Sequence, residues 1–178
     1  MKRRYLKTFS LAAAILLVII LARPTVLSLI FGIIIVWIGE SIRIWAAGHL
    51  IRNKEFTTSG PYAYLRDPLY LGRLLLLIGF CTMSWGNSLT LLPIGLWVFF
   101  LNYMPRKHRK EMTRLEKRFG ESYKRYSAYA KSLIPKLKPY PLAQKKAWSF
   151  KLFWHENREQ YFLLGVIVVF FLIVLRMD

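Results

Sequence analysis

The chain has 178 residues, of which 55% are hydrophobic and 20% charged, and 27 Lys and Arg against 9 Asp and Glu give it a formal charge of +18. Its apolar residues occur in blocks separated by charged stretches, whereas a water-soluble domain of this length distributes them more evenly. The single cysteine, Cys81, excludes an internal disulfide framework and a cysteine-rich metal site. The composition therefore excludes a secreted disulfide-stabilised domain, a disordered tail and an ordinary cytosolic enzyme. It predicts a small all-α, polytopic membrane protein.

Five apolar segments are long enough, or nearly so, to cross a bilayer as helices. They are residues 9–22, 26–50, 69–85, 89–103 and 161–175. Arg23-Pro24 predicts a tight turn between the first two segments, and residues 85–88 predict another between the third and fourth. The first segment resembles a signal peptide but lacks a small-x-small cleavage site, so we expect it to remain as a span.

Basic residues divide unequally between the two sides that five spans would create. Of the 27 Lys and Arg, 23 fall on the side of the N-terminus, two (Arg23 and Arg176) fall on the other, and Arg43 and Arg73 lie inside spans. Because positively charged loops stay in the cytoplasm, we expect an integral, multi-pass protein of a bacterial or archaeal cytoplasmic membrane, with its N-terminus inside. No groove-binding or strand-binding motif accompanies the charge, so nucleic acid is not an expected partner.

The first segment with candidate functional residues is residues 57–72, TTSGPYAYLRDPLYLG, between the second and third spans. Ser-Gly-Pro predicts a turn, and Asp67-Pro68 has the form of an N-cap followed by proline in the first helical turn. A helix that starts beside Arg66 presents unpaired N–H groups and a positive dipole end. Such a start can simply be capped by Asp67, or it can hold a cofactor carboxylate.

The second segment, residues 111–126, has the periodicity of an amphipathic helix. Its apolar face consists of Leu115, Phe119, Tyr123 and Tyr126. Glu111 falls on this face, where an unpaired buried carboxylate would be costly, so it must either pair with a neighbouring Arg or Lys or hold a ligand. Gly120 predicts a helix end or a kink.

Several other residues carry weaker signals. Glu40 and Arg43 lie three apart in one span and predict either an ion pair or a functional site. Glycines seven apart in two spans predict close helix packing; they are Gly32 and Gly39, and Gly72 and Gly79. The three histidines, His49, His108 and His155, lack metal-ligand spacing and are expected to be solvated or interfacial. Cys81 is expected to serve packing only.

The two segments together resemble the integral-membrane methyltransferases of the isoprenylcysteine carboxyl methyltransferase and phospholipid methyltransferase type. The first matches as Gly60-Pro61-Tyr62 followed by Arg66-Asp67-Pro68-Leu69-Tyr70-Leu71-Gly72, and the second as Glu111, Leu115, Phe119-Gly120, Tyr123 and Tyr126. The resemblance covers about residues 35–140. Two positions differ from the family pattern: Asp67 stands where His or Asn is usual, and Met112 where a second Glu is usual.

The resemblance implies S-adenosylmethionine as cofactor, membrane lipids as partners, and a lipophilic acceptor with an isoprenylcysteine-type carboxylate or a lipid amine head group. It implies that Arg66 and Glu111 are catalytic. It also implies a cofactor site made of Gly60, Tyr62, Arg66, Asp67, Pro68, Tyr70, Gly72, Glu111, Leu115, Phe119 and Tyr126. No metal is expected, since the histidines lack metal-ligand spacing. Two alternatives stay open: a non-catalytic membrane protein that kept this fold, and a nicotinamide-dependent membrane reductase of related architecture.

We expect one membrane domain over residues 1–178, with about five transmembrane helices and a cytoplasmic cofactor-binding region. Its parts are a first helical hairpin (1–50), a cytoplasmic motif loop (51–68), a second hairpin (69–103), cytoplasmic motif helices (104–135), a basic segment (136–160) and a last transmembrane helix (161–178). The basic segment mixes Lys and Arg with aromatic residues, which predicts a helix lying on the membrane surface.

Overall fold

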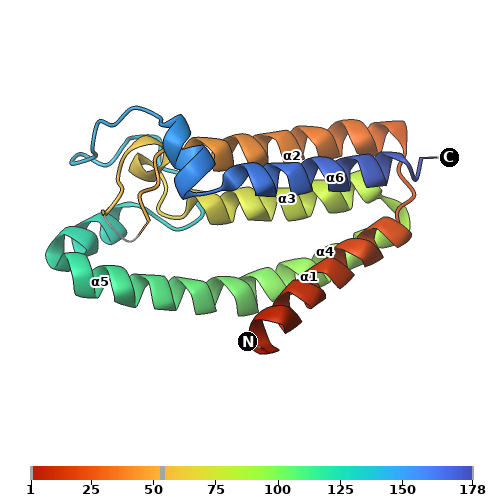
Figure 1. Ribbon diagram of the computed structural model, residues 1–178, viewed down its shortest axis with the longest axis horizontal. Helices are drawn as coiled ribbons and strands as arrows, with labels where there is room; N and C mark the ends of the chain where they lie inside the picture. The colour runs from red at the N-terminus through yellow and green to blue at the C-terminus, as the bar shows by residue number, and fades with distance from the viewer. Residues whose placement is uncertain (1, 53–54, 178) are drawn as a thin grey trace.

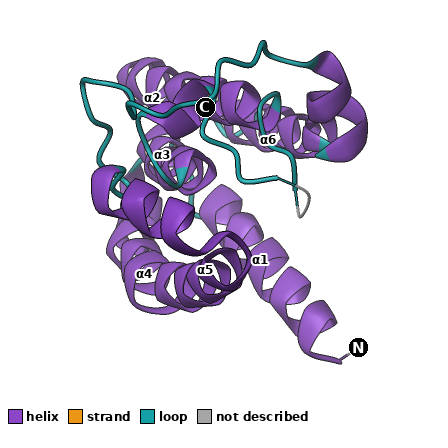
Figure 2. Ribbon diagram, turned by 90° about the vertical axis from the view of Figure 1, so that its left-hand side faces the viewer, coloured by secondary structure: helices purple, strands orange, loops and turns teal. Residues whose placement is uncertain are grey.

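The computed structural model describes residues 2–52 and 55–177 of the chain (Figure 1). Asn53 and Lys54, which belong to the predicted motif loop, lie outside the described residues. The chain is 73% helical, and the described residues contain no strand, so the predicted all-α class is confirmed. Viewed along the helices, α2, α3 and α6 form one group, and α1, α4 and α5 lie to one side of it (Figure 2).

The first hairpin joins α1 (Lys2–Ile20) to α2 (Val26–Ala47) through the predicted turn. Thr25 and Ser28 form a reciprocal capping box at the start of α2: the Ser28 N–H donates to Thr25 Oγ1 at 3.2 Å, and the Thr25 N–H donates to Ser28 Oγ at 2.8 Å. The Arg23 N–H donates to the Ser84 carbonyl at 2.7 Å, which fastens this turn to the end of α3.

Helix α3 (Pro68–Ser84) packs against α2 through two facing pairs of glycines. A Cβ atom added at Gly39 would lie 3.0 Å from the Gly72 carbonyl oxygen, and one added at Gly72 would lie 2.8 Å from the Gly39 oxygen. Gly32 and Gly79 face one another in the same way, at 2.8 and 3.1 Å. The backbones therefore approach more closely than any side chain would allow, as the spacing of the glycines predicted.

After the tight turn at Trp85 and Gly86, both of which have positive φ, the chain stays helical from residue 86 to residue 129. The stretch comprises η2 (Gly86–Thr90), α4 (Leu91–Trp97), η3 (Val98–Tyr103) and α5 (Met104–Tyr129). The predicted span 89–103 is its first part. The predicted kink is present at Gly120, whose φ of 50° and ψ of −127° interrupt the helix.

Helix α6 (Glu159–Val174) lies along α2 and α3 (Figure 1). The core between the three helices is apolar and consists of Val36, Leu76, Met83, Val166 and Ile173. At one end of α6, Glu159 forms a buried ion pair with Arg43, which also lies 3.4 Å from Glu40 and over the ring of Phe162. The predicted pair of Glu40 and Arg43 is confirmed, and Glu159 adds a partner from a helix 116 residues away.

The prediction of a surface helix within the basic segment is wrong for most of its length. Between Tyr129 and Phe150 the chain is not helical, and only a short helical stretch, which includes η4 (Leu152–Glu156), precedes α6. The backbone N–H groups of this non-helical part donate to other segments instead: that of Tyr140 donates to the Ala63 carbonyl at 2.7 Å, and that of Ser149 to the Gly48 carbonyl at 2.9 Å. Pro139 and Pro141 have no N–H to give to a helix.

Two helical stretches of the described chain, Val26–Ala47 and Gly86–Tyr129, are long and apolar enough to cross a membrane. Pro68–Ser84 and Glu159–Val174 are apolar but shorter. Large apolar side chains on the outside of α2, such as Phe31 and Trp37, are 60% and 72% exposed. Such a surface is typical of a helix that faces lipid.

Candidate functional site

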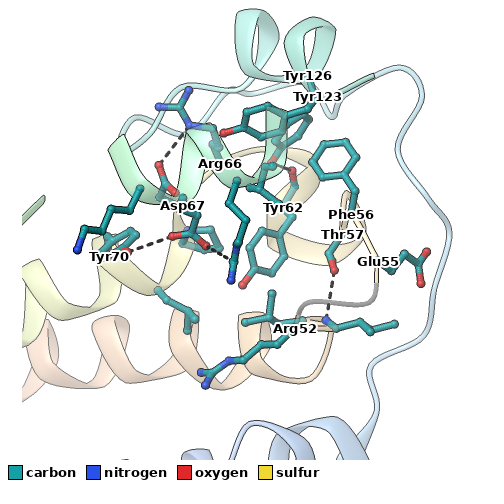
Figure 3. A pocket seen from close by; sticks show the side chains of 18 of the residues that line it. Arg52, Glu55, Phe56, Thr57, Tyr62, Arg66, Asp67, Tyr70, Tyr123 and Tyr126 are labelled. Atoms are coloured by element: carbon teal, nitrogen blue, oxygen red, sulfur yellow. Dashed lines mark hydrogen bonds and ion pairs between the residues drawn. The ribbon is translucent and has the colours of Figure 1, made fainter. Parts of the chain in front are cut away.

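A cavity of about 490 Å³ is formed by residues at the end of the molecule where the loops gather (Figure 1), and its lining side chains are drawn in Figure 3. Three parts of the chain contribute residues to its lining: residues 50–52 and 55–57, residues 62–73 around the start of α3, and residues 110–126 of α5. Its size is that of a pocket for a small organic molecule. The two predicted motif segments therefore meet at one site, although about 40 residues separate them in the sequence.

Helix α5 is fastened to the 3₁₀ turn η1 (Gly60–Ala63) by the hydroxyl of Tyr126. This hydroxyl donates to the Tyr62 carbonyl at 2.7 Å, and Tyr126 is only 1% exposed. Beyond α5, the Arg66 and Asp67 N–H groups donate to the carbonyls of residues 131 and 132 at 2.9 and 3.2 Å. These bonds hold the first motif against the chain that follows the second.

Glu111 and Tyr70 join the two motifs by a side-chain contact inside the cavity. The Tyr70 hydroxyl donates to Glu111 Oε2 at 3.2 Å, and Arg114 lies 3.9 Å from Glu111 Oε1. The expected pairing of Glu111 with a neighbouring basic residue is therefore present, but its side chain is 42% exposed and lies at the edge of the apolar face rather than buried in it. Solvent reaches it, and its oxygens retain lone pairs for a ligand.

Asp67 does not cap α3 with its side chain, which corrects the simpler interpretation of Asp67-Pro68. Its carboxylate accepts from Arg66 Nε at 3.3 Å and from Ser132 Oγ at 2.5 Å. Arg66 uses a second nitrogen, Nη2, to contact Nε2 of His108 at 3.2 Å. A guanidinium has five N–H groups, so Arg66 keeps donors for an anion in the cavity.

His108 does not line the cavity and is partly exposed, but its ring contacts Arg66 and lies near Asp67, two residues that do line it. Burial is the main cause that lowers its pKa; the positive charge of Arg66 adds to this effect, and Asp67 and Glu111 oppose it. A neutral ring whose Nε2 accepts from Arg66 carries its proton on Nδ1, which lies 3.7 Å from Asp67. The ring therefore links the two charged groups without adding a charge.

Aromatic side chains form another wall of the cavity. The ring of Phe56 lies 4.9 Å from that of Tyr126 and 5.6 Å from that of Tyr123, both edge to face. Burial raises the pKa of Tyr123 to about 12 and raises the pKa values of Tyr62 and Tyr126 further. These hydroxyls therefore remain protonated donors, and they offer no general base near neutral pH.

The structure brings together eight of the eleven predicted site residues and leaves three outside the cavity. Those lining it are Tyr62, Arg66, Asp67, Pro68, Tyr70, Glu111, Leu115 and Tyr126. Gly60 is needed for the turn, since its φ is +58° and a Cβ atom there would lie 2.3 Å from the ring of His49. Gly72 packs against α2, and Phe119 lines a neighbouring cavity.

Sequence reasoning missed several residues that line the cavity. Arg52, Glu55, Phe56 and Lys110 lie outside both motif segments, as does Arg73, whereas Thr57, Arg114 and Tyr123 lie within them but were not predicted to belong to the site. Residues 50–56 belong to neither motif segment. The only sequence signal for them was their position in the short connection between the second span and the first motif segment.

Some of the remaining expectations for single residues agree with the structure, and others do not. Cys81 is buried, as expected. His155 is exposed, whereas His49 is buried and its Nδ1 lies 3.1 Å from Ser59 Oγ, so the expectation for His49 is wrong. The described residues contain no group of three or more His, Cys, Asp or Glu suited to a metal ion. Met112 packs beside the buried cluster of Tyr123, Tyr126, Ala130 and Tyr140.

Comparison with models of known protein families gives a match. The model of a family described as phospholipid methyltransferase matches residues 20–122, from the end of α1 to the kinked part of α5. None of the curated proteins and none of the solved structures compared with the chain matches it.

Proposed function

Because the chain belongs to the phospholipid methyltransferase family, we propose that its cavity binds S-adenosylmethionine and that the protein transfers a methyl group to the head group of a membrane lipid. The resemblance predicted from the two motifs is thereby confirmed, and methyl transfer is the family's chemistry. The observation that supports the proposal most directly is the Tyr70–Glu111 hydrogen bond at 3.2 Å, which joins the two motifs inside one cavity.

The donor groups of the cavity fit the charges of this cofactor. When bound, S-adenosylmethionine supplies a methyl group on a positively charged sulfur. On our proposal, Glu111 accepts from the cofactor's amino group or ribose hydroxyls, and the free donors of Arg66 bind a carboxylate. Tyr62, Tyr70 and Tyr126 form walls that exclude water and orient the reacting atoms, which is most of what an in-line displacement requires.

The acceptor is proposed to come from the bilayer. Helix α3 begins beside the cavity, and the helical stretch that leads into α5 exposes large apolar side chains such as Trp97 and Leu101. Each methylene of an acyl or prenyl chain adds about 0.8 kcal/mol to partitioning into the membrane. Only the head group then needs to reach the cofactor. The acceptor atom is a carboxylate oxygen, which is already nucleophilic, or an amine nitrogen, which must first lose a proton.

We further propose five transmembrane helices with a cytoplasmic N-terminus. In support, Arg176 at the C-terminus donates to the Ile20 carbonyl at 3.4 Å, and Arg23 packs beside Gly86, so these basic residues share one end of the molecule. The segments that line the cavity lie at the other end (Figure 1). Reporter fusions after residues 55, 87, 145 and 178 should read inside, outside, inside and outside, and a cytoplasmic C-terminus would rule out five spans.

The test of function is transfer of labelled methyl groups. Membranes containing the protein are incubated with methyl-labelled S-adenosylmethionine, and label should enter an organic-extractable product. Glu111→Gln should reduce this product at least tenfold, because a charge-assisted hydrogen bond contributes about 1.5–3 kcal/mol. Glu116→Gln, at an exposed position of the same helix that does not line the cavity, is the matched control.

Calorimetry on detergent-purified protein separates the alternatives. Binding of S-adenosylhomocysteine without methyl transfer would indicate a non-catalytic member, as the changed positions Asp67 and Met112 would allow. Binding of NADPH instead would indicate a reductase. Label confined to the protein or aqueous fraction would contradict a lipid acceptor.

A further inference from the structure

The cavity holds more positive charge than its own acidic groups balance. Five basic residues line it, Arg52, Arg66, Arg73, Lys110 and Arg114, and three acidic residues, Glu55, Asp67 and Glu111. Each acidic group already has a basic partner: Asp67 pairs with Arg66, Glu111 with Arg114, and Glu55 with Lys146, which does not line the cavity. Among the described residues, Arg52 and Arg73 have no carboxylate within ion-pairing distance.

Arg73 lies on the membrane side of the site. It follows Tyr70 by three residues on α3, within the predicted span 69–85, and its side chain is half-buried. Its guanidinium carbon is 5.9 Å from the ring centre of Tyr70 and 5.6 Å from that of Tyr103. These aromatic rings hold the cation beside the cavity, but they do not neutralise it.

Arg52 approaches the same part of the cavity from a different segment. It lies beyond the end of α2, on the side of the cavity away from Arg66 (Figure 3). Arg52 and Arg73 are close enough to repel one another, and both repel the buried Arg43. An anion placed between the first two would remove this repulsion.

The shape of the guanidinium favours a particular kind of anion. Its fork of N–H groups binds phosphate and carboxylate oxygens in pairs, and two guanidinium groups from separate segments suit the several oxygens of a phosphate. The group must also reach Arg73, which lies toward the bilayer rather than toward the Arg66 and His108 side. A phosphate attached to a lipid meets both conditions.

We propose that Arg52 and Arg73 form a subsite for the phosphate of the acceptor lipid's head group, which it anchors while the methyl-accepting atom faces the cofactor. This inference rests on the proposed function: the family's name implies a phospholipid acceptor, and the inference adds the two residues that bind its phosphate. Arg52 and Arg73 are then positioning residues, since they bind the substrate away from the reacting atoms.

The test is a binding measurement that does not depend on turnover. Detergent-purified protein is titrated with dihexanoyl phosphatidylethanolamine, with dihexanoylglycerol, which lacks the phosphate, and with inorganic phosphate. The parent should bind the first most tightly. Arg73→Gln and Arg52→Gln should each weaken this binding about 10- to 100-fold, since each removes a charge-assisted hydrogen bond. Arg109→Gln, an exposed arginine of α5 that does not line the cavity, should change it less than twofold.

Titration with S-adenosylhomocysteine distinguishes the failure of this subsite from the failure of the proposed function. If the parent protein does not bind S-adenosylhomocysteine but binds the phospholipid through Arg73, the proposed methyltransferase function would be refuted and the proposed subsite would be supported. Variants that lose S-adenosylhomocysteine instead of the phospholipid would assign the arginines to the cofactor and overturn the subsite. Equal binding of inorganic phosphate and phospholipid would overturn the lipid source. If Arg73→Gln does not fold, the test can still be made with Arg52→Gln, because Arg52 is exposed.

Discussion

Tyr126→Phe should measure how strongly the two motif segments are held together. The substitution removes the hydroxyl that donates to the Tyr62 carbonyl at 2.7 Å and, at 3.4 Å, approaches the Leu65 carbonyl. It keeps the ring, which packs against Phe56 and Tyr140, so no cavity forms. The effect therefore reports the hydrogen bond alone.

The magnitude follows from burial. Tyr126 is 1% exposed, so water cannot replace the lost donor, and a buried carbonyl without a partner costs about 1–3 kcal/mol. For a chain of 178 residues, each kcal/mol lowers Tm by about 2–4 °C. We expect the Tm of the detergent-purified protein to fall by about 2–12 °C.

Tyr129→Phe is the matched control. Its hydroxyl also donates to backbone carbonyls, those of Lys138 and Pro139 at 3.0 and 3.1 Å, but these bonds are exposed to solvent. Water can take its place, so the loss should stay below about 0.5 kcal/mol. Thermal unfolding followed by tryptophan fluorescence compares the two variants. If they lost the same stability, the reasoning from burial would be refuted.

Three further substitutions test other parts of the structure. In Gly72→Ala the new methyl group would lie 2.4 Å from Cγ of Arg43 and 2.8 Å from a backbone oxygen of α2, so α2 and α3 must separate and thermal unfolding should show a loss of about 1–3 kcal/mol. Glu159→Gln breaks a buried ion pair with Arg43, and the same measurement should show a loss of about 3–5 kcal/mol. The pKa of His108 is lowered below 6.5 mainly by burial, so its neutral form stabilises the fold fully above that pH, and the contribution is lost as the pH falls below it. Tm measured between pH 5 and 8 should therefore drop on the acid side, and His108→Gln should flatten this part of the profile by removing the group that contacts Arg66.

Each of these has a control in the chain. Nothing lies within 4 Å of a Cβ atom added at Gly165, so Gly165→Ala should leave Tm nearly unchanged. Glu156→Gln and His155→Gln alter exposed side chains and should have little effect. Equal losses at Gly72 and Gly165, or at Glu159 and Glu156, would contradict the packing described, and an unchanged acid limb in His108→Gln would exclude this ring as its source.

The sequence alone determined the class of the protein and much of its local structure. Apolar blocks dictate helices because a bilayer or an apolar core leaves backbone groups no other partner than the helix itself. The turns at residues 23–24 and 85–88 could be predicted because proline and glycine restrict or free the backbone locally. Glycines seven apart lie on one face of a helix whatever surrounds it, so the packing of α2 on α3 was also predictable.

The tertiary structure decided which residues share the site. Arg52 and Phe56 belong to no motif and join it only because the chain beyond α2 folds back over the start of α3. Glu159 meets Arg43 across 116 residues, a distance that no periodicity spans. The chain between α5 and residue 150 is irregular rather than helical because its N–H groups donate to carbonyls of other segments, such as those of Ala63 in η1 and Gly48 just after α2. A backbone donor takes whichever acceptor the whole fold brings near, and local sequence specifies only those within a few residues.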